Sequence, residues 1–253
     1  MMIDFKKYED EYNKHYKQKF SIEELLIKER QKVVKDTIRK FKHDSVLEIG
    51  CGKNPFFKVF TNFEQYHIVE PVNSFIIQAK ELVMKDNRFE FFNCTIEDSS
   101  FLEKIMKNRY DFIIVSSLLH EVSNPKLLLS AIKRIADKST IIHFNVPNVF
   151  SFHRLLAVKA NVINDVFEKS DTEKRFQRNN RYDMKSFKAL LINSGFEIFE
   201  TGTYFLKPFT SLQLEKMLSK GIVENSVIEA LGMMIEFMPD MGCEMYANVR
   251  TSG

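Results

Sequence analysis

The sequence contains no tryptophan and only three cysteines among its 253 residues. Cys51, Cys94 and Cys243 are odd in number and lie far apart, so neither a disulfide framework nor the paired spacing of a zinc site is expected. No apolar run reaches the length of about 20 residues that a membrane-spanning helix needs. The charged segment 1–19 has no apolar core, so we expect no secretory signal and a soluble cytoplasmic protein.

Neither sign of charge dominates, because 37 Lys and Arg oppose 34 Asp and Glu, for a formal net charge of +3. This excess is too small to indicate a nucleic-acid partner by itself. There is no internal repeat and no low-complexity linker. A length of 253 residues with 44% hydrophobic content predicts a single domain, 1–253.

Short apolar segments alternate with helical ones through residues 44–146, which predicts a doubly wound, mostly parallel α/β sheet. The predicted strands of this half are 45–49, 66–70, 89–93, 110–116 and 140–146. One predicted helix begins after Pro55, and three further predicted helices cover 73–85, 99–108 and 125–136.

Three further segments flank this half. Residues 1–43 are charged and amphipathic, which predicts a helical N-terminal extension. Residues 147–195 are predicted to form a helical lid that carries substrate contacts, above the carboxyl edge where such sheets bind ligands. Residues 196–253 contain two more predicted strands, 196–206 and 243–250, with helical sequence between them.

Two neighbouring strand ends carry a pattern typical of a nucleotide-like ligand. Residues 46–52 read Val-Leu-Glu-Ile-Gly-Cys-Gly, and a Gly-x-Gly turn lets backbone N–H groups approach a ligand. Glu70 ends the next strand, where a carboxylate can accept hydrogen bonds from two ribose hydroxyls. Glu48 is costly to bury without a partner, and a positively charged amino-acid ligand near the turn would supply one.

The run Glu48 to Gly52 resembles the first motif, E/D-x-G-x-G, of class I S-adenosylmethionine-dependent methyltransferases. The resemblance implies a seven-stranded sheet, with an antiparallel last strand between strands five and six. It also implies S-adenosylmethionine as cofactor and S-adenosylhomocysteine as product. A nicotinamide site usually has a third glycine, where this chain has Pro55. A turn with no ligand is the other alternative.

The same resemblance assigns cofactor contacts to four strand ends. The turn would surround the methionine part, Glu70 the ribose, the segment after strand three the adenine, and the end of strand four the sulfonium. For Glu97 and Asp98, a helix N-cap is an equally open interpretation. The predicted cofactor residues are Glu48, Gly50, Cys51, Gly52, Glu70, Pro71, Thr95, Ile96, Glu97 and Ser116.

Methyl transfer to oxygen or nitrogen requires alignment of the reacting atoms and often removal of a proton. His120 follows strand four at the ligand edge and is the predicted general base, with packing on adenosine or a helix cap as alternatives. Many family members carry Glu-His in this loop, whereas here the order is His120-Glu121. Asn124 rules out the HExxH pattern, and no metal is predicted. His143 is expected to be a core histidine.

Residues 145–154, Arg181-Tyr182, Gly195-Phe196, 206–208 and 247–249 resemble a methyltransferase subgroup of bacterial surface-polysaccharide (capsule and LPS) and sugar pathways. That resemblance, with a cationic insertion, implies a small anionic, phosphate- or nucleotide-bearing acceptor methylated on a hydroxyl or a phosphate or phosphoramidate oxygen. Lys174, Arg175 and Arg178 are expected on a solvated face. The predicted substrate residues are Glu121, Asn145, His153, Arg154, Arg181, Tyr182 and Lys207.

Two other functions stay open at this point. One is a methyltransferase acting on RNA or protein, although the Asn/Asp-Pro-Pro-Tyr/Phe motif of base-nitrogen enzymes is absent after strand four. The other is a catalytically silent S-adenosylmethionine-binding scaffold, although the intact Glu48, Gly50, Gly52 and Glu70 argue against degeneration. The sequence does not indicate an oligomeric state.

Overall fold

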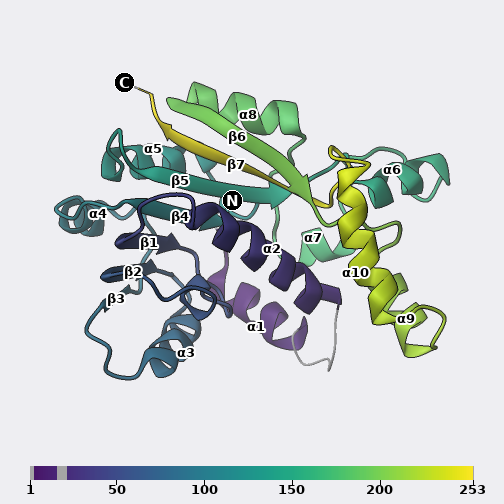
Figure 1. Cartoon of the computed structure of the whole chain (residues 1–253), viewed down its shortest axis with the longest axis horizontal. Coiled ribbons are helices and arrows are strands. Elements are labelled where there is room, and N and C mark those ends of the chain that lie inside the picture. The colour runs from purple at the N-terminus through teal and green to yellow at the C-terminus, as the bar shows by residue number, and fades with distance from the viewer. Residues whose placement is uncertain (1–2, 16–21, 253) are drawn as a thin grey trace.

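A seven-stranded sheet crosses the molecule in the order β3-β2-β1-β4-β5-β7-β6 (Figure 1). The computed structural model describes residues 3–15 and 22–252. All neighbouring strands are parallel except for β7, which runs antiparallel to both β5 and β6. This confirms the predicted fold class. The strands are β1 (Ser45–Ile49), β2 (Gln65–Val69), β3 (Phe89–Phe92), β4 (Phe112–Ser116), β5 (Ile141–Pro147), β6 (Phe196–Tyr204) and β7 (Glu244–Thr251).

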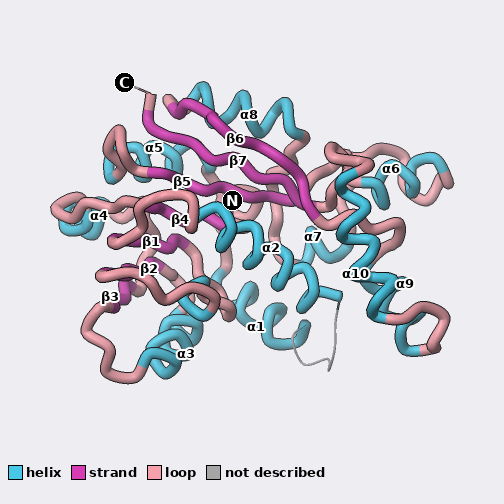
Figure 2. The backbone as a smooth tube through the Cα atoms, in the orientation of Figure 1, coloured by secondary structure: helices cyan, strands magenta, loops and turns pink. Residues whose placement is uncertain are grey.

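Helices cover both faces of the sheet, and apolar strands buried on both faces are what a parallel sheet of this kind requires. One face carries α4 (Ser99–Ile105), α5 (Pro125–Ile135) and α8 (Met184–Asn193). The other carries α2 (Ile22–Ile38) and α3 (Asn73–Val83), as Figure 2 shows.

The remaining helices are α1 (Phe5–His15), α6 (Phe152–Lys159), α7 (Asp171–Arg175), α9 (Ser211–Ser219) and α10 (Asn225–Met233). Of these, α6, α7, α9 and α10 lie on the right-hand side of the view in Figure 1, and α1 lies below α2. Helices α9 and α10 pack on the start of α2 through Leu214 and Ile228, which contact the cluster that contains Ile22 and Leu26. Of the predicted extension 1–43, residues 1, 2 and 16–21 lie outside the described residues.

Two predicted helices differ from the structure. After Pro55 there is only a 3₁₀ turn, η1 (Phe56–Lys58), because the following aromatic side chains Phe60 and Phe63 are buried in the core on an irregular path to β2. The helical sequence after Thr210 is divided, since Gly221 has a φ of +64° where α9 ends; a second 3₁₀ turn, η2 (Met234–Glu236), follows α10.

Candidate active site

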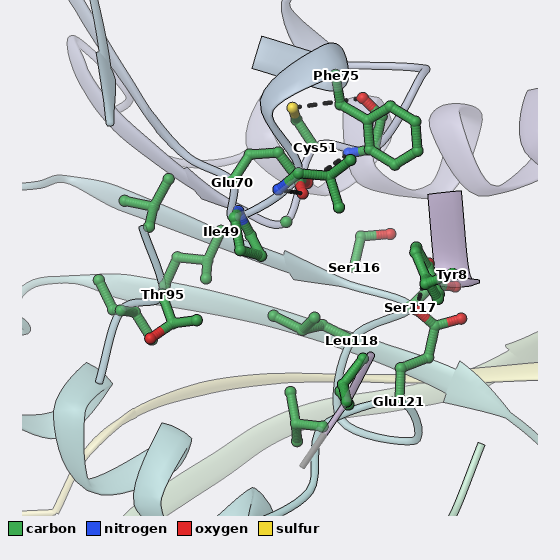
Figure 3. Close-up of a pocket in the computed structure, with 18 of the residues that line it drawn as sticks. Tyr8, Ile49, Cys51, Glu70, Phe75, Thr95, Ser116, Ser117, Leu118 and Glu121 are labelled. Atoms are coloured by element: carbon green, nitrogen blue, oxygen red, sulfur yellow. Dashed lines mark hydrogen bonds between the residues drawn. The ribbon is translucent and has the colours of Figure 1, made fainter. Parts of the chain in front are cut away.

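A cavity of about 370 Å³ lies at the carboxyl ends of β1, β2 and β4, with α1 on its outer side. Parallel strands bring their carboxyl ends to one edge, which is why motifs far apart in the sequence meet there. Figure 3 shows the strand-end residues Cys51, Glu70, Thr95 and Ser116 around this space. The predicted cofactor residues that line it are Gly50, Cys51, Gly52, Glu70, Pro71, Thr95, Ile96, Glu97 and Ser116.

The turn after β1 depends on its two glycines. Gly50 has a φ of +77° and donates its N–H to Val69, and a Cβ there would lie 3.3 Å from Leu118. Gly52 has a φ of +52°, and a Cβ there would have no neighbour within 4 Å. L-residues with side chains rarely adopt these angles. At Gly52 the turn therefore leaves open space beside its backbone, as a cofactor cradle requires.

Glu70 is buried beside this turn and holds it in place. Its carboxylate accepts hydrogen bonds from the backbone N–H groups of Gly52, at 3.0 Å, and Val72, at 2.9 Å. Burial raises the pKa of Glu70 to about 7, although these two hydrogen bonds lower it in part. Because a carboxylate has about four lone-pair sites, Glu70 can also accept hydrogen bonds from a ribose diol.

Glu48 lies behind the turn and does not line the cavity. It is 1% exposed and accepts hydrogen bonds from the backbone N–H of Phe56 and the hydroxyl of Tyr66. Burial raises the pKa of Glu48 to about 8. The sequence predicts the ammonium group of the ligand as the partner of Glu48. In the structure its partners are Tyr66 and the backbone N–H of Phe56, which stabilise the turn.

The two acids after β3 have separate roles. Asp98 is the N-cap of α4, where its side chain accepts from the backbone N–H groups of Ser100 and Phe101. Glu97 lines the cavity, and burial raises its pKa. Asp98 is therefore the helix cap, and Glu97 is the acid that lines the cavity at the position predicted to contact adenine. The adenine contact of Glu97 stays a prediction.

Glu121 lies at the opposite side of the cavity from Thr95 (Figure 3). The Tyr8 hydroxyl donates to Glu121 Oε2 at 2.6 Å, and Arg178 Nε donates to Oε1 at 3.1 Å. Burial by itself would raise the pKa of Glu121. The charge of Arg178, with His120 and Tyr8 nearby, outweighs burial and lowers that pKa to about 2. Glu121 is therefore an ionised carboxylate. Arg178 is not on a solvated face, contrary to the sequence-based expectation.

His120 is 3% exposed and does not line the cavity. Its Nε2 lies 3.5 Å from Glu121 Oε1, and neither ring nitrogen has a hydrogen-bond partner among the described residues. Burial lowers the pKa of His120, so the ring is neutral near pH 7. The predicted general base thus lies behind Glu121, and its catalytic role stays a prediction.

Helix α1 closes the cavity with two tyrosines that the sequence analysis did not identify. Tyr12 makes edge contacts with Phe75, at 5.6 Å between ring centroids, and with Phe176, at 5.4 Å. Tyr8 contacts Phe176 at 6.1 Å. Phe5, Tyr8 and Tyr12 share one face of the helix at spacings of three and four residues. That aromatic stripe is the signal that could have predicted a ligand-facing helix.

The Arg and Lys residues predicted for substrate binding have partners within the protein, Arg154 and Arg181 inside the insertion and Lys207 after β6. Arg154 Nε donates to the carbonyl of Val166, and its guanidinium lies 3.7 Å from Glu173. Arg181 Nε donates to Glu173 at 3.0 Å. Lys207 donates to Ser211 at 3.0 Å. All three therefore have partners inside the protein, and none of them lines the cavity.

Three other predicted substrate residues also lie outside the cavity lining. Asn145 accepts from the backbone N–H of Ser117 at 2.9 Å and so fixes the end of β4. Tyr182 is buried, with its hydroxyl 3.4 Å from the carbonyl of Leu119. His153 Nδ1 has no hydrogen-bond partner within the described chain. His143 bonds Asn248 at 2.7 Å in the core, as expected.

Within residues 3–15 and 22–252, no three His, Cys, Asp or Glu side chains are placed to hold a metal ion. In the same part of the chain, no helix is long and apolar enough to span a membrane.

Known proteins share this sequence pattern and architecture. A family model described as a methyltransferase domain matches residues 12–201. No curated protein matches the sequence. A Thermotoga maritima S-adenosylmethionine-dependent methyltransferase, described as a possible histamine N-methyltransferase, is 14% identical, with 97% of each chain covered and a TM-score of 0.60.

Two more solved structures share the fold. A Mesorhizobium loti S-adenosylmethionine-dependent methyltransferase is 10% identical over 86% of this chain and 95% of its own, with a TM-score of 0.59. The plantazolicin methyltransferase BamL, solved with S-adenosylhomocysteine, is 15% identical over 88% and 85%, with a TM-score of 0.56.

Proposed function

Since the chain belongs to the methyltransferase-domain family, we propose that it transfers a methyl group from S-adenosylmethionine to a small-molecule acceptor at the Glu121 end of its cavity. The observation that carries the proposal is the continuous cavity from the glycine turn and Glu70 to Glu121. One end has the groups that a nucleoside cofactor needs, and the other has a buried, ionised carboxylate beside aromatic rings.

When bound, S-adenosylmethionine would supply an electrophilic sulfonium methyl: the acceptor lone pair would form a bond to this carbon, the carbon–sulfur bond would break to leave S-adenosylhomocysteine, and the proton of the acceptor O–H or N–H would pass to solvent water. The protein binds the cofactor and the acceptor and orients them for transfer. Glu70 accepts hydrogen bonds from the ribose, and the backbone of Gly50 and Gly52 surrounds the methionine part. Tyr8 and Tyr12 exclude water. Holding the two reactants in the correct orientation provides much of the lowering of the activation barrier in such direct displacements.

Glu121 acts in this proposal as a hydrogen-bond acceptor that orients an O–H or N–H group of the acceptor. A carboxylate with a pKa of about 2 is a weak base at neutral pH, so it suits orientation better than retention of a proton. His120 is a positioning residue that packs behind Glu121, with its Nε2 3.5 Å from Glu121 Oε1.

The sequence suggested a finer assignment, an anionic sugar or nucleotide-linked acceptor of a polysaccharide pathway. That assignment depended on the subgroup resemblance and on a cationic lid; of its members, Arg154, Arg181 and Lys207 contact the protein itself and do not line the cavity. We therefore propose the broader class of small-molecule acceptors. Methylation of RNA or protein, and cofactor binding with no turnover, are the competing proposals.

Calorimetric titration with S-adenosylhomocysteine, and in parallel with NAD, tests the cofactor half. We expect binding of S-adenosylhomocysteine alone. Glu70→Gln should weaken it by about ten- to hundredfold, because a hydrogen bond to a charged group contributes about 1.5–3 kcal/mol. Glu90→Gln, which alters a carboxylate outside the cavity, is the control.

Absence of S-adenosylhomocysteine binding by the unmodified protein would contradict the proposal. Unchanged affinity in Glu70→Gln would place the ribose elsewhere. Binding without methyl transfer to any acceptor would favour the silent scaffold, and salt-dependent binding of RNA would favour the nucleic-acid alternative.

A further inference from the structure

The two ends of the cavity differ in charge and in surface. At the Glu70 end the carboxyl group has a raised pKa and binds two backbone amides. At the Glu121 end the carboxylate is ionised and faces a wall that includes Tyr8, Tyr12 and Phe176. The acceptor must occupy this second end if the proposed function holds, and the present inference depends on that function.

The Glu121 end presents a carboxylate, not a guanidinium, to the cavity. Arg178 balances the charge of Glu121 through its Nε and has its guanidinium carbon 5.3 Å from the centre of the Phe176 ring, but it is not among the described residues that line the cavity. Burial and the charge of Glu121 raise the pKa of Tyr8 well above its ordinary value, so the phenol stays protonated and donates to Glu121.

The two cations among the described lining residues, Arg30 and Lys53, also have partners. Arg30 donates two hydrogen bonds to Glu244, which neutralises its charge. Lys53, which directly follows the glycine turn, donates to Asn13 at 2.6 Å; this amide is neutral, so the charge of Lys53 stays beside the turn. At the Glu121 end an anionic acceptor would meet an ionised carboxylate, and like charges brought together cost several kcal/mol.

Aromatic rings form the outer wall of this end. The Tyr8 and Phe176 rings meet nearly perpendicularly, at 77°, with Tyr12 packed against both. Rings in such arrangements accept a further flat apolar group at an edge or face. A cation near their faces is stabilised as well, by about 0.5–2 kcal/mol.

We propose that the acceptor is an uncharged or cationic compound with a flat apolar body, which packs on Tyr8 and Phe176 and donates an O–H or N–H to Glu121. This class excludes phosphorylated and nucleotide-linked acceptors. Tyr8, contributed by α1, becomes a specificity-determining residue, because it both covers the acceptor and holds Glu121 in place.

Three probes that differ only in one terminal group test the charge preference on the full chain saturated with S-adenosylhomocysteine. They are tyramine (cationic), tyrosol (neutral) and 4-hydroxyphenylacetate (anionic), and glucose 1-phosphate represents a sugar phosphate. We expect ligand-detected NMR to show tyramine and tyrosol bound at least about tenfold more tightly than the two anions. Glu121→Gln should reduce the ratio between tyramine and 4-hydroxyphenylacetate severalfold.

Preference for either anion in the unmodified protein, or failure of all four probes to bind, would overturn the inference. So would an unchanged ratio in a Glu121→Gln variant that still binds S-adenosylhomocysteine. If that variant does not fold, the comparison of probes on the unmodified protein decides by itself. Absence of S-adenosylhomocysteine binding in the unmodified protein contradicts the proposed function. Binding of S-adenosylhomocysteine together with a preference for the anionic probes contradicts only this inference.

Discussion

Glu48, Glu70 and Glu121 are all buried carboxyl groups, and their neighbours set their ionisation. Glu121 has a guanidinium beside it, which keeps it charged in spite of burial. Glu70 has two backbone N–H donors and a pKa raised to about 7. Glu48 has one backbone amide and one phenol, and burial raises its pKa further, to about 8. Charge at this site is therefore a property of contacts rather than of residue type.

Glu48 predicts a pH dependence of folding. Its folded pKa is raised above the ordinary value of 4.5, so its favourable contribution is complete below about pH 4.5 and is lost as the pH rises towards about 8. This carboxyl by itself should therefore lower the free energy of urea unfolding of the ligand-free protein at about pH 8 relative to about pH 5. Glu48→Gln, neutral at both, should reduce this loss. The buried His120, His143 and His153, whose pKa values burial lowers, act in the opposite direction.

The exposed Glu64 provides the matched control. Glu64→Gln should leave the pH-dependent loss as it is in the unmodified protein. The same loss in Glu48→Gln would mean that Glu48 is already ionised in the folded protein. Glu70 shifts in the same direction, so some loss should persist in the variant.

At the scale of elements, α1 connects three parts of the site. Tyr8 contacts the loop after β4, Tyr12 contacts α3 through Phe75, and the backbone of Asp4 exchanges hydrogen bonds with the side chain of Gln177. All of these contacts are made by side chains or a helix end, with no strand pairing. An element attached in this way can separate from the body at modest cost.

Tyr12→Ala should speed exchange of S-adenosylhomocysteine. The variant loses three aromatic contacts, to Tyr8, Phe75 and Phe176, of about 0.5–1.5 kcal/mol each, so we expect release at least about tenfold faster in a chase with labelled ligand. Faster association as well would identify α1 as a cover that must open. Faster release with unchanged association would mean that Tyr12 only contacts the ligand. Phe237→Ala, which removes an exposed ring outside the cavity lining, should change neither rate.

At the scale of the whole molecule, a buried ion pair joins the N-terminal and C-terminal segments. Arg30 of α2 donates Nε to Glu244 of β7 at 2.9 Å and forms a second, shorter contact with it, and Tyr204 of β6 donates to the same carboxylate. Because Arg30 also lines the cavity, this pair fixes α2 relative to the sheet beside the proposed acceptor end.

Arg30→Met should lower the free energy of unfolding in urea by about 3–5 kcal/mol, because Glu244 would stay buried without its partner. The double variant Arg30→Met with Glu244→Gln should recover part of the loss, which a double-mutant cycle measures. A double variant as unstable as the sum of the two single variants would show that the pair has no coupling. Lys40→Met, which removes the cation of the more exposed Lys40–Glu200 pair, should cost less than about 1 kcal/mol.

Local patterns carried much of the prediction. The strand that ends at Gly50 and the acid at Glu70 have signatures within a few residues, and the parallel sheet brings them together by its own geometry. The 3₁₀ turn after Pro55 was predicted as a longer helix, because the need to bury Phe60 and Phe63 is not visible in local propensity. Arg154 and Arg181 were predicted to face a ligand, yet Glu173 pairs with both.

The sequence by itself determined the doubly wound sheet and the strand-end residues that line the cavity, because these follow from short-range periodicity and from turns that only glycine allows. The cofactor class follows from the resemblance of the run Glu48 to Gly52 to the methyltransferase motif. The tertiary structure alone decided what faces the acceptor. Tyr8 and Arg178 reach Glu121 across 113 and 57 residues of chain. Contacts of that range depend on how α1 and the insertion pack on the sheet edge, and no local pattern encodes that packing.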